Sequence, residues 1–289
     1  MSQPFRLDGV FTVLPTAFHD DGRLDPAGVV ALVDAARGEG VAGLTALGVM
    51  GEAAELTDAE RAEVLSCITD AAGSLPIVVG VTGDTAAEVE GRARDAGHAG
   101  VGAVMVSPSR SLGLHDAVRA AATAGMPIVI QDYPPASGVT LTAADIVAVA
   151  RTQSLVVGVK AEAPPTRATI AAVQLAIPGL ALVGGLGGLF LIDELRAGAN
   201  GVMTGFALPE RLVAVVETYR TDPGSAARDW EQLLPLMRFE AFQPFSLAAR
   251  KEVWRLRGVI GSAYCRRPGA GLDDRAREDV RRALERVSA

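Results

Sequence analysis

Short apolar runs alternate along the chain with longer segments in which apolar residues recur every three or four positions. The short runs are rich in Val, Ile and Leu and are predicted as strands; they lie at Val10–Leu14, Gly43–Leu47, Ile77–Val81, Ala103–Val106, Ile128–Ile130, Val156–Val159, Leu180–Val183 and Gly201–Met203. The segments between them are predicted as helices, and several begin with capping signals such as Thr57-Asp58-Ala59-Glu60. Nearly continuous apolar strands separated by helices predict a parallel sheet that is covered on both faces.

The number and spacing of these units predict the fold class. Eight strand-and-helix units within residues 1–221 favour an α/β chain folded as a (β/α)8 TIM barrel, which typically has roughly 250 residues. A doubly wound open sheet is the alternative, but no GxGxxG loop follows the first strand. Residues 222–289 have a purely helical pattern, with segments near 225–238, 244–257 and 273–287. We therefore expect a barrel at 1–221 and a C-terminal helical domain at 222–289.

Composition and charge narrow the class of protein. The chain has 289 residues, of which 49 % are hydrophobic, and a net charge of −7, with no basic stripe that would bind nucleic acid. Residues 170–192 are uncharged, but Pro178-Gly179 and a glycine cluster interrupt them, so we expect no membrane span. The N-terminus lacks the pattern of a signal peptide, and the two cysteines and three histidines are too far apart to suggest a metal site. These features predict a cytoplasmic protein whose partner is neither nucleic acid nor a membrane.

Lysine is rare in this chain, since two of its 27 lysines and arginines are lysines. One of them, Lys160, ends an apolar strand-like run, where a lysine that is partly removed from water can lose its proton and attack a carbonyl carbon. Arginine cannot do this chemistry, because its guanidinium stays protonated. The alternative is a salt-bridged lysine at a strand end. In a barrel, the carboxyl ends of the strands carry the chemistry, and Lys160 lies at the sixth of these ends.

Several strand ends carry motifs that point to a known family. They are Pro-Thr-x-Phe at 15–18, Gly-x-x-Gly-Glu at 48–52, Gly-Val-Lys at 158–160 and the glycine-rich turn at 184–188. With the helical C-terminus, these marks resemble the dihydrodipicolinate synthase / N-acetylneuraminate lyase family over almost the whole chain. The resemblance implies a class I lyase or aldolase in which Lys160 forms a Schiff base with a 2-oxo acid, commonly pyruvate. It implies no further cofactor and a homo-oligomer, either a tetramer or a dimer.

The loop after the second strand departs from the family pattern. The family usually has Thr-Thr where this chain has Val49 and Met50, so both hydroxyls that would hold the substrate carboxylate and relay protons are missing. The backbone N–H groups of this loop, which ends at Gly51, remain available as donors. The loop therefore predicts either a reshaped, more apolar pocket or a site that has lost or changed its activity.

Two further family positions differ on and after the fifth strand. The family's catalytic Tyr aligns with Gln131, which has no accessible pKa and cannot carry a proton. Tyr133 lies two residues further on, and is either a substitute proton carrier or a loop aromatic packed on the adjacent prolines. The family's Arg, which meets a second carboxylate in the synthase, aligns with Ala136. We therefore do not expect dihydrodipicolinate synthase activity.

Four other residues complete the predicted binding site. Arg110 either binds a carboxylate or is a surface arginine, and Glu162 either acts as a base or pairs with Lys160 and keeps it charged. Gly185 and Met203 lie at the ends of the seventh and eighth strands and are expected to contact the substrate. Glu52 is interpreted as a charge favoured by a helix N-terminus.

The leading hypothesis is a Schiff-base lyase, aldolase or dehydratase acting on a 2-oxo acid. One alternative is a catalytically divergent member of the family that binds a small acid. Another is a phosphosugar-dependent TIM-barrel enzyme, because barrels often bind phosphate after the seventh strand, where this chain has its glycine-rich turn.

Overall fold

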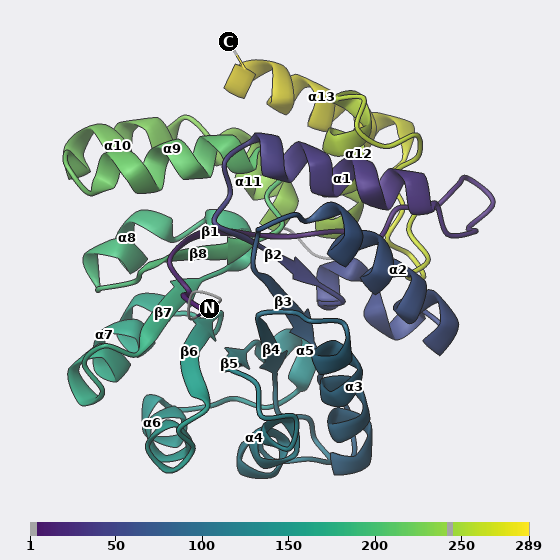
Figure 1. Cartoon of the computed structure of the whole chain (residues 1–289). Coiled ribbons are helices and arrows are strands. Elements are labelled where there is room, and N and C mark those ends of the chain that lie inside the picture. Colours follow the sequence, from purple (N-terminus) through teal and green to yellow (C-terminus); the bar gives the residue numbers. More distant parts are fainter. Residues whose placement is uncertain (1–4, 242–244, 289) are drawn as a thin grey trace. The chain divides into compact units, whose positions relative to one another are not determined.

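The computed structural model describes residues 5–241 and 245–288 and contains a closed barrel whose strands follow one another in chain order (Figure 1). The eight strands are β1 Gly9–Val13, β2 Gly43–Ala46, β3 Ile77–Gly80, β4 Ala103–Val106, β5 Ile128–Asp132, β6 Val156–Ala161, β7 Ala181–Gly184 and β8 Gly201–Thr204. The expected (β/α)8 barrel followed by C-terminal helices is therefore confirmed, and the open sheet is excluded.

Helices follow the strands throughout the chain. They are α1 Pro26–Gly38, α2 Asp58–Ala71, α3 Ala86–His98, α4 Leu114–Ala122, α5 Pro134–Ser137, α6 Ala143–Thr152, α7 Thr166–Ala176, α8 Leu191–Arg196, α9 Pro209–Tyr219, α10 Pro223–Glu231, α11 Leu234–Ala241, α12 Ser246–Leu256 and α13 Asp274–Ser288. Three short 3₁₀ turns lie at η1 Val49–Gly51, η2 Ala53–Glu55 and η3 Leu186–Gly188. A capping box at Thr57 begins α2, as the sequence predicts, and another at Thr142 begins α6.

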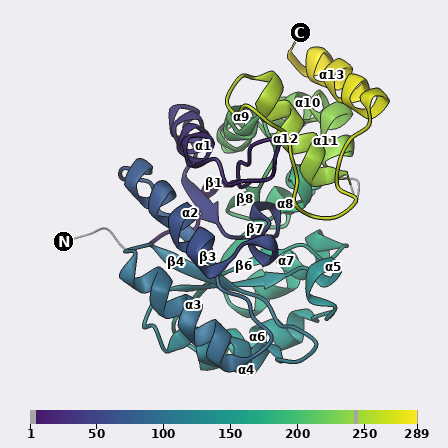
Figure 2. The same cartoon turned by 90° about the vertical axis from the view of Figure 1, so that its right-hand side faces the viewer.

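One compact unit comprises Met1–Gly9, Pro76–Gly185 and Phe190–Met203. Its strands β3 to β7 pair in parallel, and the helices α3, α4 and α6 lie together beside them (Figure 2). The strands are buried almost throughout, which explains why their sequences are nearly continuous apolar runs rather than alternating ones.

The other compact unit comprises Val10–Leu75, Leu186–Leu189 and Thr204–Ala289. It contains the parallel pair of β1 and β2, and helices α11, α12 and α13 pack on one another within it. The segment predicted as one helix near 225–238 is two helices, α10 and α11, because the chain turns at Gln232-Leu233. The start of the helix predicted at 244 lies outside the described residues, and the domain boundary at 221/222 stays a prediction.

The uncharged stretch at 170–192 is divided among α7, β7, η3 and the start of α8. Among the described residues, no helix combines the length and the apolar character that a membrane crossing requires.

Candidate active site

Lys160 lies near the carboxyl end of β6, between two register partners. Gln131 of β5 is its neighbour on one side and Val183 of β7 on the other. The Lys160 ammonium nitrogen Nζ lies 3.0 Å from Oε2 of Glu162, and the two side chains are only 6 % and 7 % exposed. Removing two such charges from water costs several kcal/mol per charge, and their mutual attraction offsets this desolvation cost only when the geometry is good. A buried pair at a barrel's strand ends therefore calls for a chemical as well as a structural explanation.

Gln131 holds the same carboxylate oxygen. Its amide Nε2 donates a 2.7 Å hydrogen bond to Glu162 Oε2, so this oxygen interacts with both the amide and the Lys160 ammonium group. The two interactions fix the position of the carboxylate next to the lysine. Glu162 can therefore exchange a proton with Lys160 without moving, because a proton passes directly between heavy atoms at hydrogen-bond distance.

The glycine after β7 makes room for this carboxylate. A Cβ atom on Gly185 would overlap the Glu162 carboxyl group, so a residue with a side chain does not fit there unless Glu162 moves. The Glu162 carboxylate thus lies against the turn where the phosphosugar alternative places a phosphate. Its negative charge disfavours an anionic group at this position.

Two further carboxyl groups of the same unit have raised pKa values. Burial, and then the charge of Glu162, raise the pKa of Asp132 to about 6. Burial also raises the pKa of Glu194, on α8, to about 7; the Thr166 hydroxyl opposes this in part, and the charges of Glu162 and Asp193 add to it. The Glu194 side chain lies against the other glycine of the turn, Gly184, where a Cβ would overlap its carboxyl group. Near neutral pH Glu194 is therefore partly protonated, whereas Asp132 is largely ionised.

Three other residues of this unit that the sequence predicts for the site, Tyr133, Arg110 and Met203, differ in burial and position. Tyr133 is half-buried and follows the end of β5, where it is the N-cap residue of α5. Arg110 is exposed, and its guanidinium lies across Gly138 at the end of α5. Met203 is fully buried in β8. The proposed roles of these three residues in catalysis or binding stay predictions.

The loop after β2 belongs to the other unit. Val49 and Met50 are half-buried, and the Gly51 N–H donates to the Gly48 carbonyl at 3.0 Å, which closes the η1 turn. The Thr16 hydroxyl, from the Pro-Thr-x-Phe motif, donates to the Gly51 carbonyl at 2.6 Å. The N–H groups of Val49 and Met50 come before the first hydrogen bond of this turn and have no acceptor within it. They are the donors that the sequence predicts for a substrate carboxylate.

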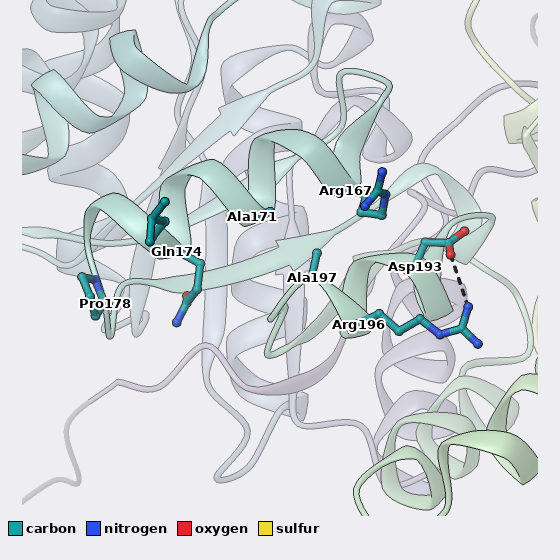
Figure 3. A pocket seen from close by; sticks show the side chains of 8 residues that line it. Arg167, Ala171, Gln174, Pro178, Asp193, Arg196 and Ala197 are labelled. Atoms are coloured by element: carbon teal, nitrogen blue, oxygen red, sulfur yellow. Dashed lines mark ion pairs between the residues drawn. The ribbon is translucent and has the colours of Figure 1, made fainter.

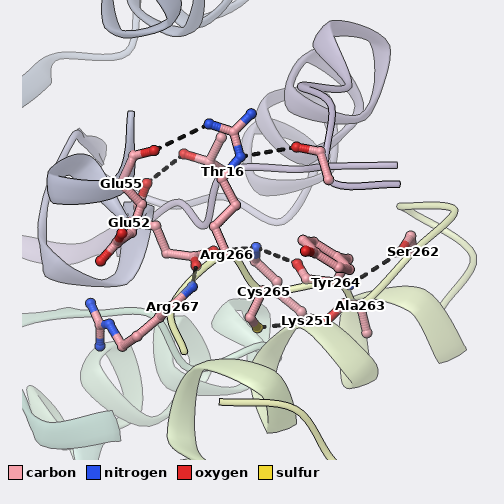
Figure 4. Close-up of polar contacts among 12 residues, drawn as sticks. Thr16, Glu52, Glu55, Lys251, Ser262, Ala263, Tyr264, Cys265, Arg266 and Arg267 are labelled. Atoms are coloured by element: carbon pink, nitrogen blue, oxygen red, sulfur yellow. Dashed lines mark hydrogen bonds and ion pairs between the residues drawn. The ribbon is translucent and has the colours of Figure 1, made fainter. Parts of the chain in front are cut away.

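Glu52 is the N-cap residue of the short turn η2, but its side chain makes no capping hydrogen bond, so the interpretation of its charge as one that serves a helix N-terminus is corrected. Its backbone is left-handed, with φ 50°, and its side chain is fully buried in an ion pair with Lys251, whose Nζ lies 2.5 Å from Glu52 Oε1 (Figure 4). Lys251 Nζ also donates to the Tyr264 carbonyl at 2.8 Å and lies 4.5 Å from the centre of the Phe18 ring. The second lysine of the chain is therefore fully engaged by neighbours within the fold.

A shallow pocket on the outside of the first unit lies between α7 and α8 (Figure 3). It is lined by Arg167, Ala171, Gln174, Leu175, Pro178, Asp193, Arg196 and Ala197. Its charged side chains are largely exposed, as in the Asp193–Arg196 pair at 3.5 Å, and none of the residues around Lys160 lines it. Exposed pairs of this kind contribute little binding energy, so the pocket is a weaker candidate than the Lys160 site.

Comparison with known proteins identifies the family. The model of the dihydrodipicolinate synthetase family matches residues 6–287. The chain belongs to this family. It is 30 % identical over 286 residues to L-2-keto-3-deoxyarabonate dehydratase of Azospirillum brasilense, covering 94 % of this chain and 92 % of that protein. It is also 30 % identical over 248 residues to 4-hydroxy-tetrahydrodipicolinate synthase of Stenotrophomonas maltophilia, covering 82 % and 83 %.

A solved structure agrees with this assignment. Dihydrodipicolinate synthase of Rhodopseudomonas palustris superposes with a TM-score of 0.91 at 34 % identity, covering 97 % of both chains. The resemblance read from the motifs and the expected class of enzyme, a lyase or aldolase, are confirmed. Since a dehydratase and a synthase match at the same identity, overall similarity does not select the reaction. The residues around Lys160 must decide it.

The sequence did not single out three residues that lie close to Glu52 or Glu162 in the structure, namely Lys251, Asp132 and Glu194. Lys251 shares the rarity that singled out Lys160, and this signal pointed equally to both lysines. Asp132 directly follows Gln131, but a carboxylate at a strand end has no distinctive pattern. Glu194 lies among ordinary helical residues, and its burial depends on the glycine opposite it, which no local sequence pattern reveals.

Proposed function

We propose that this protein is a Schiff-base lyase that removes water from a hydroxylated 2-oxo acid of the 2-keto-3-deoxy sugar acid class. The observation that carries the proposal is the buried contact of 3.0 Å between Lys160 Nζ and Glu162 Oε2, with Gln131 holding the same oxygen. A nucleophile and a base in direct contact are the pair that this chemistry needs. The name of the Azospirillum relative, a dehydratase of a 2-keto-3-deoxy acid, supports the choice of substrate class.

The first step forms the covalent adduct. Glu162 accepts a proton from the Lys160 ammonium group, and the neutral amine adds to the keto carbon of the acid. One proton of the adding nitrogen passes to the keto oxygen, and Glu162 returns the proton it took, so that the oxygen leaves as water and an iminium forms between Lys160 and the substrate. The iminium withdraws electrons from the neighbouring carbon, so this proposal requires no further cofactor. The backbone N–H groups of Val49 and Met50 are proposed to bind the substrate carboxylate.

The second step is an elimination. Glu162 takes a proton from the carbon next to the iminium, and the C–H electrons form an enamine. The enamine then expels the hydroxyl group of the following carbon, which leaves as water with a proton returned by Glu162. One C–H bond and one C–O bond are broken and one C=C bond forms, with no oxidant or reductant. Water then hydrolyses the remaining iminium, which releases the product as a 2-oxo acid and frees Lys160. A carboxylate is suited to both proton transfers, which would explain why the chain can have Gln131 where the family has Tyr.

Borohydride trapping tests the proposal, and the chain supplies its own control. With pyruvate or a 2-keto-3-deoxy sugar acid, reduction is expected to leave a stable adduct on the peptide that contains Lys160. No adduct is expected on the peptide that contains Lys251, because its ammonium group is fully buried and paired. An unaltered chain that yields no adduct with any 2-oxo acid, or an adduct that persists in Lys160→Arg, would contradict the Schiff-base function.

Product analysis separates dehydration from aldol cleavage. Dehydration leaves one product that retains every carbon atom of the acid, whereas cleavage releases pyruvate, which lactate dehydrogenase detects. Pyruvate released at the rate of substrate loss would assign the chain to the aldolases instead. A dimer or tetramer is proposed from the family resemblance alone, and sedimentation velocity of the intact chain tests it.

A further inference from the structure

One of the two N–H groups proposed as carboxylate donors, that of Met50, belongs to a peptide that is held in place from the C-terminal part of the chain. The loop Gly48–Glu52, called here the β2 loop, has lost the hydroxyls that the family usually has, so its donors are backbone groups alone. A backbone donor is useful only if its peptide plane is fixed, because rotation of that plane turns the N–H away from the ligand. The contacts that fix these planes therefore bear on the proposed binding of the substrate carboxylate.

Arg267 fixes the peptide between Val49 and Met50. Its Nη2 donates to the Val49 carbonyl at 3.0 Å, and the Glu52 N–H donates to the same oxygen at 3.2 Å. The Val49 C=O and the Met50 N–H belong to one planar, trans peptide and point in opposite directions. Whatever holds the carbonyl on one side of the loop therefore aims the Met50 N–H to the other side.

Arg267 is itself fixed by the buried ion pair. Its backbone N–H donates to Glu52 Oε2 at 2.8 Å, while Lys251 Nζ lies 2.5 Å from Oε1 of the same carboxylate (Figure 4). Lys251 and Glu52 are fully buried, and in such a setting hydrogen bonds to charged groups are shorter and stronger than neutral ones. The Glu52 carboxylate thus joins α12 and the segment Ser262–Arg267 to the β2 loop.

A second contact from the same segment strengthens the attachment. Arg266 pairs with Glu60 at 2.6 Å, donates to the Glu55 carbonyl at 3.1 Å and stacks 4.3 Å above the centre of the Phe18 ring. The segment therefore contacts the β2 loop, the residues that follow it and the residues that follow β1. All of these groups belong to one compact unit.

We propose that Arg267, anchored by the Glu52–Lys251 pair, is a positioning residue that aims the Met50 N–H at the carboxylate of the 2-oxo acid. This inference rests on the proposed function, because it assumes that the acid binds through its carboxylate at the β2 loop. It assigns the helical C-terminus a role in recognising the substrate. Arg267 acts through the loop and is not itself a ligand of the substrate.

The test compares two carbonyl compounds that differ in the carboxylate. Pyruvate carries it and hydroxyacetone does not, and borohydride trapping at Lys160 reports the concentration that gives half-maximal labelling for each. In Arg267→Met, this concentration is expected to rise about tenfold for pyruvate, a factor that corresponds to ~1.4 kcal/mol, and to stay unchanged for hydroxyacetone. Arg267→Lys, which keeps one donor, is expected to recover part of the loss. Arg275→Met, an exposed position on α13, is the matched control and is expected to match the unaltered chain.

The outcomes distinguish the proposed role of Arg267 from the proposed Schiff-base function. An equal rise for both compounds would mean general damage to the site, and no rise for pyruvate would mean that Arg267 does not aim a donor; either result overturns the inference. If the unaltered chain forms no adduct, the Schiff-base function fails. Calorimetric binding of pyruvate then decides the inference, which is overturned if Arg267→Met binds pyruvate as tightly as the unaltered chain does.

Discussion

Replacing Glu194 with Gln is predicted to stabilise the protein at alkaline pH and to change little at acidic pH. Burial raises the pKa of Glu194 from the ordinary value of 4.5 to about 7. A carboxyl group with a higher pKa in the folded than in the unfolded protein binds its proton more tightly when folded. Its contribution to stability is therefore fully present below about pH 4.5 and is lost as the pH rises through about 7.

The size of the effect follows from the pKa difference. Each pKa unit corresponds to about 1.4 kcal/mol, so the difference between 4.5 and about 7 amounts to about 3 kcal/mol, most of it lost between about pH 5 and pH 8.5. Gln has nearly the shape of the protonated acid and does not titrate. For a chain of this size, the free-energy change corresponds to a difference in Tm of about 5 to 10 °C between Glu194→Gln and the unaltered protein at pH 8.5.

Thermal unfolding followed by circular dichroism at pH 5 and pH 8.5 measures this difference. Other buried acids, such as Asp132, are present in both proteins, so their titration cancels in the comparison at each pH. Glu217→Gln, at an exposed position of α9, is the control and is expected to shift Tm equally at both pH values. If Glu194→Gln also shifts Tm equally at pH 5 and pH 8.5, then Glu194 is not held protonated by burial and the reasoning is refuted.

Three further predictions follow from the buried contacts. Lys251→Met is expected to lower the free energy of unfolding by about 3–5 kcal/mol in urea titrations, because it leaves Glu52 buried without its cation. Adding Glu52→Gln should recover much of this loss, and no recovery would contradict the explanation by a buried ion pair. Glu162→Gln is expected to slow both the formation of the trapped adduct and turnover, the latter about 10²- to 10⁴-fold, whereas unchanged turnover would exclude Glu162 as the base. Gly184→Ala is expected to lower the free energy of unfolding by about 1–3 kcal/mol through overlap with Glu194, and Glu194→Ser should relieve it if that overlap is the cause.

The sequence predicts the barrel because strands and helices leave different periodic patterns. The apolar runs that contain Val104, Val159 and Leu182 lie in β4, β6 and β7, and these residues are fully buried. Helix interruptions can be missed where the helical periodicity continues across them. The break at Gln232-Leu233 between α10 and α11 comes just before Pro235, which lies in the first turn of α11, and this proline is the local signal that could have divided the predicted helix.

The candidate site is predictable only as far as it depends on strand order. Lys160 could be placed at a strand end because β6 is the sixth apolar run. The pairing of Glu52 with Lys251 joins residues 199 positions apart, and nothing local to either residue announces it. Similarly, two alternatives remained open for Glu162 because distance along the chain does not reveal which polar groups face it. The contact with Gln131 comes from the parallel register of β5 and β6.

The replacements at Gln131 and Ala136 fit a mechanism in which a group other than a tyrosine on β5 carries the proton. A tyrosine on β5 can carry a proton at its own position, whereas Gln131 carries none and instead orients Glu162. In the proposed mechanism the proton carrier is Glu162, which directly follows β6 and lies 3.0 Å from Lys160 Nζ. A base so close to the lysine is well placed for the hydrogen on the carbon next to the iminium, which is the hydrogen that elimination of water must remove. Ala136 supplies no cation for a second carboxylate, and elimination needs none because it has no second substrate to bind. The same set of replacements that argues against condensation with a charged aldehyde therefore favours dehydration of a single hydroxylated acid.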